Sequence, residues 1–184
     1  MLLLDMSDSM SAYSLTVQFT AYANVLDDMR GKLRNTRIVA IAFGREPVIV
    51  SDGNVDDAIK VFTYLTDSQN RGKLVIDRSG TCIKLAMEYV ERMIPDMEHP
   101  IVMDISGDGL ENCEKGIRDL SRKFLYDYGV IINSLPIAGY DSPLFQFYDN
   151  EVTTGLTIPA LTIDNFEKAL YVKLNLEIAM LGIK

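Results

Sequence analysis

Hydroxyl and carboxylate side chains gather in three short segments of this 184-residue chain. Residues 5–9 read Asp-Met-Ser-Asp-Ser, residues 79–81 read Ser-Gly-Thr, and residues 106–109 read Ser-Gly-Asp-Gly. The polar side chains of all three segments offer hard oxygen atoms, which are the ligands that Mg²⁺ prefers. The three segments therefore suit one divalent cation, provided that the fold brings them together.

The spacing within the first segment favours such a site. Where the chain leaves a strand, alternate residues point the same way, so Asp5, Ser7 and Ser9 face one point while Met6 and Asp8 turn aside. Zinc is disfavoured, because it prefers nitrogen and sulfur ligands and the one histidine of the chain is expected at the other end of its strand. The pattern thus indicates an oxygen-ligated cation.

The elements that must position these segments follow from the apolar pattern. Apolar runs predict strands at residues 1–6, 37–43, 47–51, 100–106, 130–135 and 156–163. Apolar residues at helical spacing predict helices at residues 11–33, 54–66, 81–94, 117–128, 142–148 and 164–181, the last with Asp164 as its N-cap.

Strands that alternate with helices predict a three-layer, doubly wound α/β fold, whose mostly parallel sheet has helices on both faces. Residues 37–51 read as a hairpin, and Pro47 suits an edge position, so one antiparallel edge strand is expected. In such sheets ligands bind beyond the carboxyl ends of the strands. The three polar segments are predicted at that edge.

Composition limits the classes of function. The chain is 48% hydrophobic and 24% charged and contains no linker or repeat, which predicts a single domain over residues 1–184. Its net charge of −8 argues against nucleic acid and anionic lipid as partners. No apolar run approaches the roughly 20 residues of a membrane span, and the sequence opens without an export signal, which indicates the cytoplasm.

The residues at 5–9, Gly-Thr at 80–81 and the strand ending in Ser-Gly-Asp-Gly at 106–109 resemble the metal-ion-dependent adhesion site of von Willebrand factor A domains. Residues 101–112 and 128–137 are similar to those of an uncharacterised bacterial branch of that family, whose members often follow a secretion signal. The resemblance spans nearly the whole chain. It implies a site that binds Mg²⁺, or Mn²⁺, and leaves one position open for a carboxylate of a protein partner.

Carried onto this sequence, the resemblance implies hydroxyl ligands at Ser7, Ser9 and Thr81 and carboxylates at Asp5 and Asp108. Two positions depart from the family pattern. Asp8 adds a negative charge that favours the cation but repels an acidic partner, and Ser79 stands where the related branch tends to have glycine. The charge at Asp8 leaves the chemistry of the partner open.

Two functions follow from these observations. The first is a protein-interaction module that presents Mg²⁺ to an acidic residue of a partner. The alternative is a structural or adaptor subunit of a larger assembly, in which the metal site is vestigial or stabilising. We expect no enzyme, because His99 lies too far from Ser7 and Ser9 for a Ser-His-Asp arrangement and hydrolysis at the metal lacks a separate general base.

Five residues outside the predicted site carry open interpretations. Cys82 and Cys113 lie near the same edge of the sheet, so a disulfide is conceivable, but without an export signal two unpaired thiols are favoured. Asp104, inside a strand, is expected to have a structural role and to need a buried partner. Tyr148, like Tyr140, belongs either to the core or to a binding face.

Overall fold

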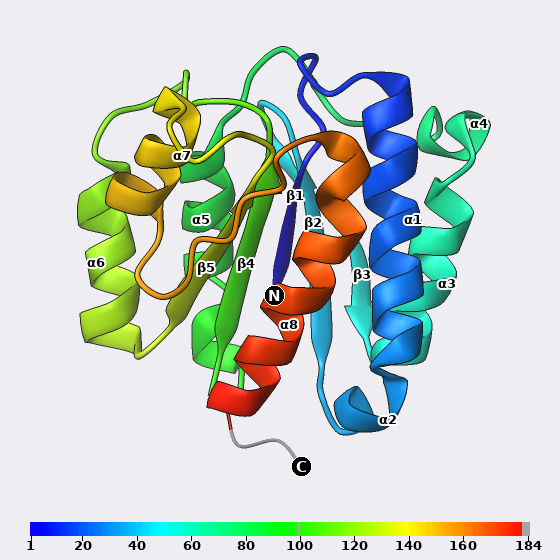
Figure 1. Cartoon of the computed structure of the whole chain (residues 1–184). Helices are drawn as coiled ribbons and strands as arrows, with labels where there is room; N and C mark the ends of the chain where they lie inside the picture. Colours follow the sequence, from blue (N-terminus) through cyan, green and yellow to red (C-terminus); the bar gives the residue numbers. More distant parts are fainter. Residues whose placement is uncertain (99, 182–184) are drawn as a thin grey trace.

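One five-stranded sheet with the strand order β3-β2-β1-β4-β5 forms the middle layer of the protein in this computed structural model (Figure 1). The strands are β1 (Leu2–Asp5), β2 (Ile38–Phe43), β3 (Pro47–Gly53), β4 (Val102–Gly107) and β5 (Ile131–Pro136). The structure describes residues 1–98 and 100–181, so His99 and its predicted place lie outside the described residues.

Strand β1 lies at the centre of the sheet. All four of its residues are buried, as expected for a strand covered on both faces. It pairs in parallel with β2 and with β4, and β4 pairs in parallel with β5. The edge strand β3, which begins at Pro47, runs antiparallel to its neighbour β2. The predicted fold class, including the antiparallel edge strand, is confirmed.

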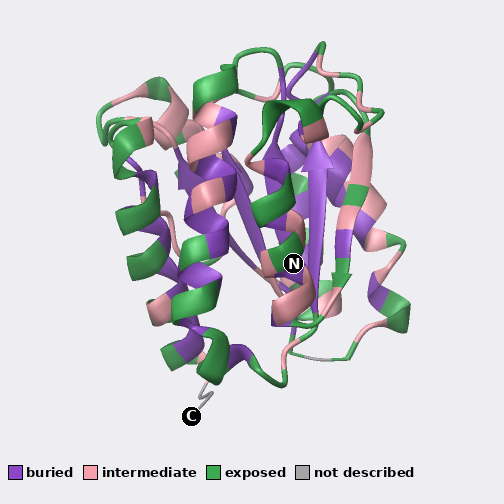
Figure 2. Cartoon of the chain, turned by 90° about the vertical axis from the view of Figure 1, so that its right-hand side faces the viewer, coloured by how far each residue is buried: buried purple, intermediate pink, exposed green. Residues whose placement is uncertain are grey.

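Helices cover both faces of the sheet (Figure 1). On one face lie α1 (Ala12–Asp28), α3 (Val55–Leu65) and α8 (Phe166–Met180), and on the other lie α5 (Ile83–Glu91) and α6 (Ile117–Tyr128). Figure 2 shows the strands buried between helices whose outer sides are exposed. The shorter elements are α2 (Arg30–Leu33), α4 (Ser68–Arg71), η1 (Ile94–Asp96), α7 (Pro143–Phe147), η2 (Tyr148–Val152) and η3 (Ile163–Asn165).

Aromatic packing and side-chain caps fix the helices on the first face. The ring of Tyr22 in α1 lies 5.3 Å from that of Phe62 in α3 and 5.9 Å from that of Phe166 in α8. Asn54 caps α3 and forms the reciprocal capping box with Asp57. The aromatic contacts hold α1, α3 and α8 against one another on this face of the sheet.

The structure differs from the sequence-based prediction in three elements. Residues 156–163 form no strand, only two isolated bridges beside β5, and Pro159 between them has no N–H to donate. Asp164 is not the N-cap of α8: its carboxylate accepts a hydrogen bond from the Tyr13 hydroxyl at 2.7 Å, and α8 begins after a short 3-10 turn. The helix predicted over 11–33 is interrupted at Met29.

The structural role of Asp104 is confirmed by its buried partner. Its carboxylate pairs with the ammonium of Lys173, a residue of α8 that is completely buried. Lys173 also lies 2.7 Å from Glu177, which accepts a hydrogen bond from Asn133 at 2.9 Å. Burial lowers the pKa of Lys173, and the negative charge of Glu177 opposes that effect. This cluster ties α8 to the centre of the sheet.

Candidate metal centre

The predicted ligands meet at the carboxyl ends of β1 and β4, which lie toward the top of Figure 1. Asp5 is the last residue of β1, and Asp108 directly follows β4. Because these two strands are parallel neighbours, their ends lie side by side. Thr81 comes just before α5, at the same edge of the sheet. The three segments singled out in the sequence are therefore brought together by the fold.

Four of the five predicted ligands form one continuous chain of hydrogen bonds. The Thr81 hydroxyl donates to Ser7 Oγ at 3.1 Å, and Ser7 Oγ lies 2.9 Å from Ser9 Oγ. Ser9 Oγ in turn donates to Asp108 Oδ1 at 2.5 Å. We call Thr81, Ser7, Ser9 and Asp108 the hydroxyl chain. Oxygen atoms this close together can face a single small cation.

The fifth residue, Asp5, is completely buried at the base of this chain. Its Oδ1 accepts a hydrogen bond from the Ser7 backbone N–H at 2.8 Å, whereas its Oδ2 is buried and has no hydrogen-bond partner among the described residues. Burial raises the pKa of Asp5 to about 6, with the charge of Asp108 contributing to this increase and the hydrogen bonds from Ser7 opposing it. A buried, half-satisfied carboxylate next to hydroxyl oxygens fits a divalent cation.

Two glycines allow the loops to approach this closely. A Cβ atom on Gly107 would lie 2.6 Å from Asp5 Oδ2, and a Cβ atom on Gly109 would overlap the side chain of Thr81. Both contacts are closer than real Cβ atoms make, so larger residues would push the loops apart. The Gly-Asp-Gly sequence therefore places Asp108 against the other two segments.

Asp8 turns away from the cluster, as the alternation predicts. Its side chain is 76% exposed and lies 3.9 Å from the guanidinium of Arg78. Arg78 is a residue that the sequence analysis did not identify. It donates hydrogen bonds to the backbone carbonyls of Met6, Ser7 and Met10 at 2.6–2.9 Å, and so holds the first loop in shape.

The expectation that the two cysteines stay unpaired is wrong. Cys82 and Cys113 form a disulfide, with Cα atoms 5.2 Å apart, between the start of α5 and the loop after β4. Next to it, the Thr81 N–H donates to Asn112 Oδ1 at 3.0 Å, and the Asn112 N–H donates to the Thr81 carbonyl at 3.2 Å. The bridge and these bonds connect the Thr81 and Asp108 segments.

Tyr148 was missed as a neighbour of the site, and the structure places it in the core and not on a surface. Its side chain is completely buried, and its hydroxyl lies close to Gly107. Tyr140, in contrast, is exposed. The sequence signal was ambiguous because tyrosine suits both environments.

The centre consists of hydroxyl groups and two carboxylates on an exposed edge. Within residues 1–98 and 100–181, no group of three histidine, cysteine or acidic residues is arranged to hold a metal, so any cation here depends on the hydroxyl oxygens. A cavity of about 610 Å³ opens at the opposite end of the sheet, between Leu33, Arg37 and Ile101, and takes no part in this centre.

Comparisons with known proteins agree with this geometry. The model of a family described as "Protein of unknown function (DUF1194)" matches residues 48–182, well over half of the chain. A comparison with curated proteins found no match. None of the helices in the described ranges is long and apolar enough to cross a membrane.

Solved structures of von Willebrand factor A domains share the fold. BatB from Bacteroides thetaiotaomicron is 17% identical with a TM-score of 0.70, and the match covers 97% of this chain and 97% of BatB. For the vWF domain of the type V pili tip protein Mfa5 from Porphyromonas gingivalis the identity is 12% and the TM-score 0.69, with 100% of this chain and 95% of that chain covered.

A third similar structure is proximal thread matrix protein 1 from the mussel byssus, with a zinc-occupied MIDAS motif. It is 18% identical with a TM-score of 0.65, and the match covers 95% of this chain but only 44% of the mussel chain. At these identities the similarities establish the fold and nothing more. The resemblance inferred from the sequence, to von Willebrand factor A domains and a bacterial uncharacterised family, is confirmed.

Proposed function

This chain belongs to the DUF1194 family, and we propose that it is a protein-interaction module that presents a divalent cation, Mg²⁺ or Mn²⁺, to a carboxylate of a protein partner. One observation carries the proposal: the hydroxyl chain adjoins Asp5 through Ser7, whose N–H donates to Asp5 Oδ1, and the buried Asp5 Oδ2 has no partner within the described part of the chain. The mussel protein with a zinc-occupied MIDAS motif supports a metal at such a site in this fold.

The five predicted ligands would contribute both neutral and negatively charged oxygen atoms to the cation. Ser7, Ser9 and Thr81 would supply neutral oxygen atoms, while Asp5 and Asp108 would balance the charge of the ion. The bound ion would supply a concentrated positive charge that attracts an anionic ligand at short range. Since the two carboxylates offset the charge of a divalent ion, the partner's carboxylate would be attracted by direct coordination to the ion and not by a net positive charge of the site.

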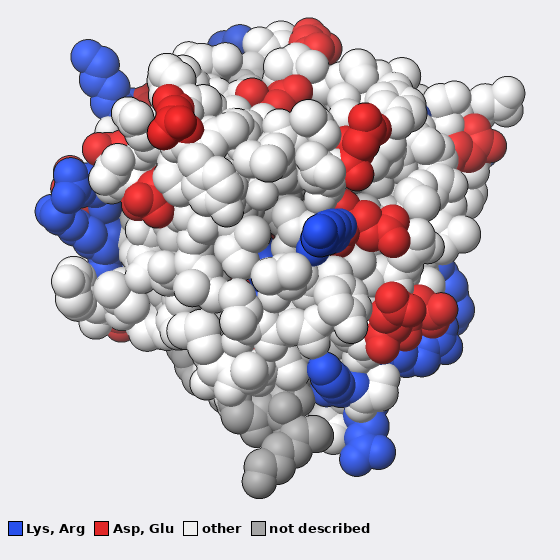
Figure 3. Space-filling model, in the orientation of Figure 1, with Lys and Arg blue, Asp and Glu red and all other residues white. Residues whose placement is uncertain are grey.

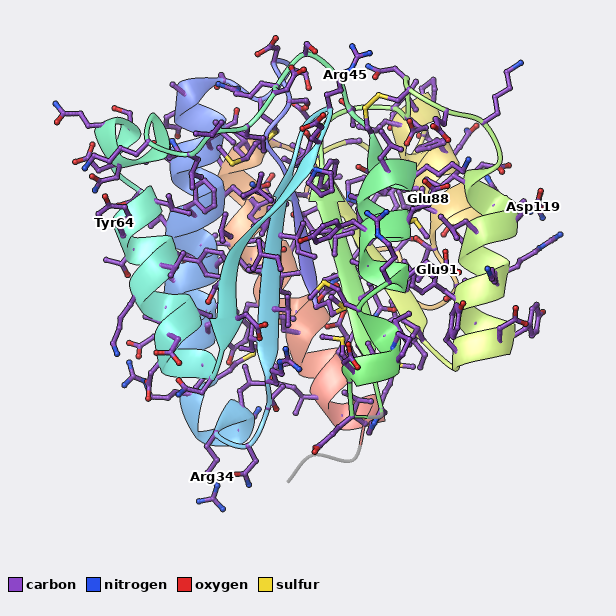
Figure 4. All side chains as sticks on the ribbon, turned by 180° about the vertical axis from the view of Figure 1, so that it is seen from behind. Arg34, Arg45, Tyr64, Glu88, Glu91 and Asp119 are labelled. Atoms are coloured by element: carbon purple, nitrogen blue, oxygen red, sulfur yellow. A yellow bond between two sulfur atoms is a disulfide. The ribbon has the colours of Figure 1, made fainter. Side chains whose placement is uncertain are left out.

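The charges around the centre favour recognition at short range. The net charge of −8 gives no long-range attraction for an acidic partner. Acidic groups are scattered over the upper part of the face that Figure 3 shows. Near the centre, Arg78 partly offsets Asp8, and the exposed Arg45 lies at the same end of the molecule (Figure 4). A partner would therefore have to place its carboxylate directly on the ion.

We infer that the chain has no catalytic role, because the centre offers no general base besides the two carboxylates. The disulfide between Cys82 and Cys113 supports an oxidising compartment as the place of action, in contrast to the cytoplasm that the start of the sequence suggested. Pilus-tip and membrane-associated proteins among the similar structures are compatible with such a location.

A second candidate function is that of an adaptor subunit whose metal site only stabilises a loop. One observation favours it: Val172, Leu176 and Met180 are exposed on α8 at intervals of four residues, which places three apolar side chains on one outward face. That face would contact other subunits without involving the cation. Chelator would then leave assembly unchanged.

Titration calorimetry with Mn²⁺ on the chelator-treated protein tests the proposal. We expect one site in the wild type and none in Asp108→Asn, whereas Asp119→Asn, which alters an exposed carboxylate on α6 (Figure 4), should bind as the wild type does. The open position is tested by the relaxation of water protons around bound Mn²⁺, which an acidic peptide should weaken by displacing water. Absence of Mn²⁺ binding in the wild type would refute the proposal.

A further inference from the structure

The hydroxyl of Tyr148 is a buried polar group that makes no hydrogen bond to the described residues. The residue opens η2, a turn of π-helix that follows α7, and its ring packs edge-on against Phe147 at 5.7 Å. The side chain is 0% exposed, and its hydroxyl has no hydrogen-bond partner within the described ranges. Burying a hydroxyl without a partner costs free energy, and phenylalanine would fill the same space without that cost. The hydroxyl is therefore expected to find a hydrogen-bond partner in the ligand-bound state of the protein.

A second unpartnered atom lies beside it. A Cβ atom placed on Gly107 would lie 3.0 Å from the Tyr148 hydroxyl and 2.6 Å from Asp5 Oδ2. Both atoms thus border the same point at the end of β4, within reach of each other directly or through one water molecule. One is a donor and the other an acceptor, so the pair is chemically complementary.

We propose that Tyr148 is a positioning residue of the cation centre, whose hydroxyl donates a hydrogen bond to Asp5 Oδ2, directly or through one water, when a cation is bound. The inference rests on the proposed function, because it requires a cation next to Asp5. It adds a residue from η2, far along the chain from the three segments that supply the predicted ligands.

The role follows from how the Asp5 carboxylate is held. Its Oδ1 is fixed by the Ser7 N–H at 2.8 Å, but nothing in the described part of the chain fixes Oδ2. A donor at Oδ2 would stop rotation of the carboxylate and support its negative charge in a buried place. Groups that orient metal ligands in this way typically contribute a factor of roughly 10–100 to metal affinity.

Tyr148 is suited to act as a neutral donor. Burial raises its pKa well above the usual value, and the charges of Asp5, Asp108 and Glu111 raise it further. The phenol therefore keeps its proton at neutral pH. It can donate to Asp5 but cannot replace it as an anionic ligand.

The test uses Tyr148→Phe, which keeps the ring and removes only the hydroxyl. We expect Mn²⁺ affinity, measured by calorimetry, to fall roughly 10–100-fold. In chelator the melting temperature of the variant should equal or exceed that of the wild type, because a buried hydroxyl without a partner has been removed. Tyr140→Phe removes an exposed hydroxyl and is the matched control, expected to change neither quantity.

Two results would overturn the inference while leaving the proposed function intact. The first is wild-type Mn²⁺ affinity in Tyr148→Phe. The second is a lower melting temperature of Tyr148→Phe in chelator, which would mean that the hydroxyl has a structural partner independent of the cation. A wild type that binds no Mn²⁺ would instead refute the proposed function and this inference with it.

Discussion

Replacing Asp5 by asparagine should stabilise the cation-free protein at neutral pH while abolishing cation binding. Asp5 is completely buried, its Oδ2 has no partner in the described structure, and burial raises its pKa from 3.8 to about 6. Asparagine keeps an oxygen that can accept the Ser7 N–H and carries no charge. The substitution thus removes the cost of burying a carboxylate.

The magnitude follows from the raised pKa. Between pH 3.8 and about 6 the folded state binds more protons at Asp5 than the unfolded state does, so the free energy of unfolding falls as pH rises through this window. Above this pH window the decrease in the free energy of unfolding is complete. It amounts to about 3 kcal/mol, at 1.36 kcal/mol per pKa unit. Since the new amide N–H groups need partners of their own, we expect a net gain of about 1–3 kcal/mol for Asp5→Asn at pH 7.5.

Urea unfolding in chelator, followed by circular dichroism at pH 7.5 and at pH 3.5, measures this difference. The gain should be present at pH 7.5 and nearly absent at pH 3.5, where the wild-type carboxyl is mostly protonated in both the folded and the unfolded state. With saturating Mn²⁺ at pH 7.5 the order should reverse, because only the wild type gains stability from the bound ion. An Asp5→Asn protein that is less stable than the wild type in chelator at pH 7.5 would refute this reasoning.

Four further outcomes are expected. Chelator should lower the melting temperature only as far as ligand linkage requires and should leave the far-ultraviolet circular dichroism at room temperature unchanged, because the buried core holds the sheet and helices together. Asp8→Asn should strengthen cation-dependent binding of an acidic peptide at low salt by less than about fivefold, since the carboxylate is exposed and Arg78 lies 3.9 Å away; weaker binding would contradict the predicted repulsion. Replacing Cys82 and Cys113 together by serine should cost about 2–4 kcal/mol in urea unfolding and weaken Mn²⁺ binding, because the Thr81 and Asp108 loops lose their tether; unchanged affinity would show that the hydrogen bonds alone hold the loops. Lys173→Met should cost about 3–5 kcal/mol, because it leaves two buried carboxylates facing each other without a cation, and an unaffected unfolding midpoint would exclude that ion pair.

Local sequence patterns determined most of the elements of this protein. The buried strands and the edge hairpin, whose second strand begins at Pro47, depend on neighbours within a few residues, so periodicity and turn rules predict them. The strand predicted over 156–163 does not form. A short apolar run beside a proline can bridge to β5 at single positions without forming a ladder, and periodicity does not distinguish the two.

The candidate centre was likewise predicted from the sequence only in part. The order of the three polar segments and the parallel sheet predicted that Asp5 and Asp108 meet, because the carboxyl ends of parallel neighbours share one edge. Their role as metal ligands stays a prediction. The sequence did not predict that Tyr148 lies against this edge. Tyr148 is far from the three segments along the chain, and the packing of η2 brings its hydroxyl close to Gly107.

The sequence by itself determined the fold class, the order of the elements and the identity of the oxygen-rich loops, since each of these follows from periodicity or from neighbouring residues. The tertiary structure alone decided that Cys82 pairs with Cys113, that Arg78 supports the first loop and that Asp164 bonds to Tyr13 instead of capping α8. These contacts join residues distant in sequence, and their energies depend on distances that only the packed chain fixes. The residue types in each loop thus identified the candidate ligands, and tertiary packing determined which residues contact one another.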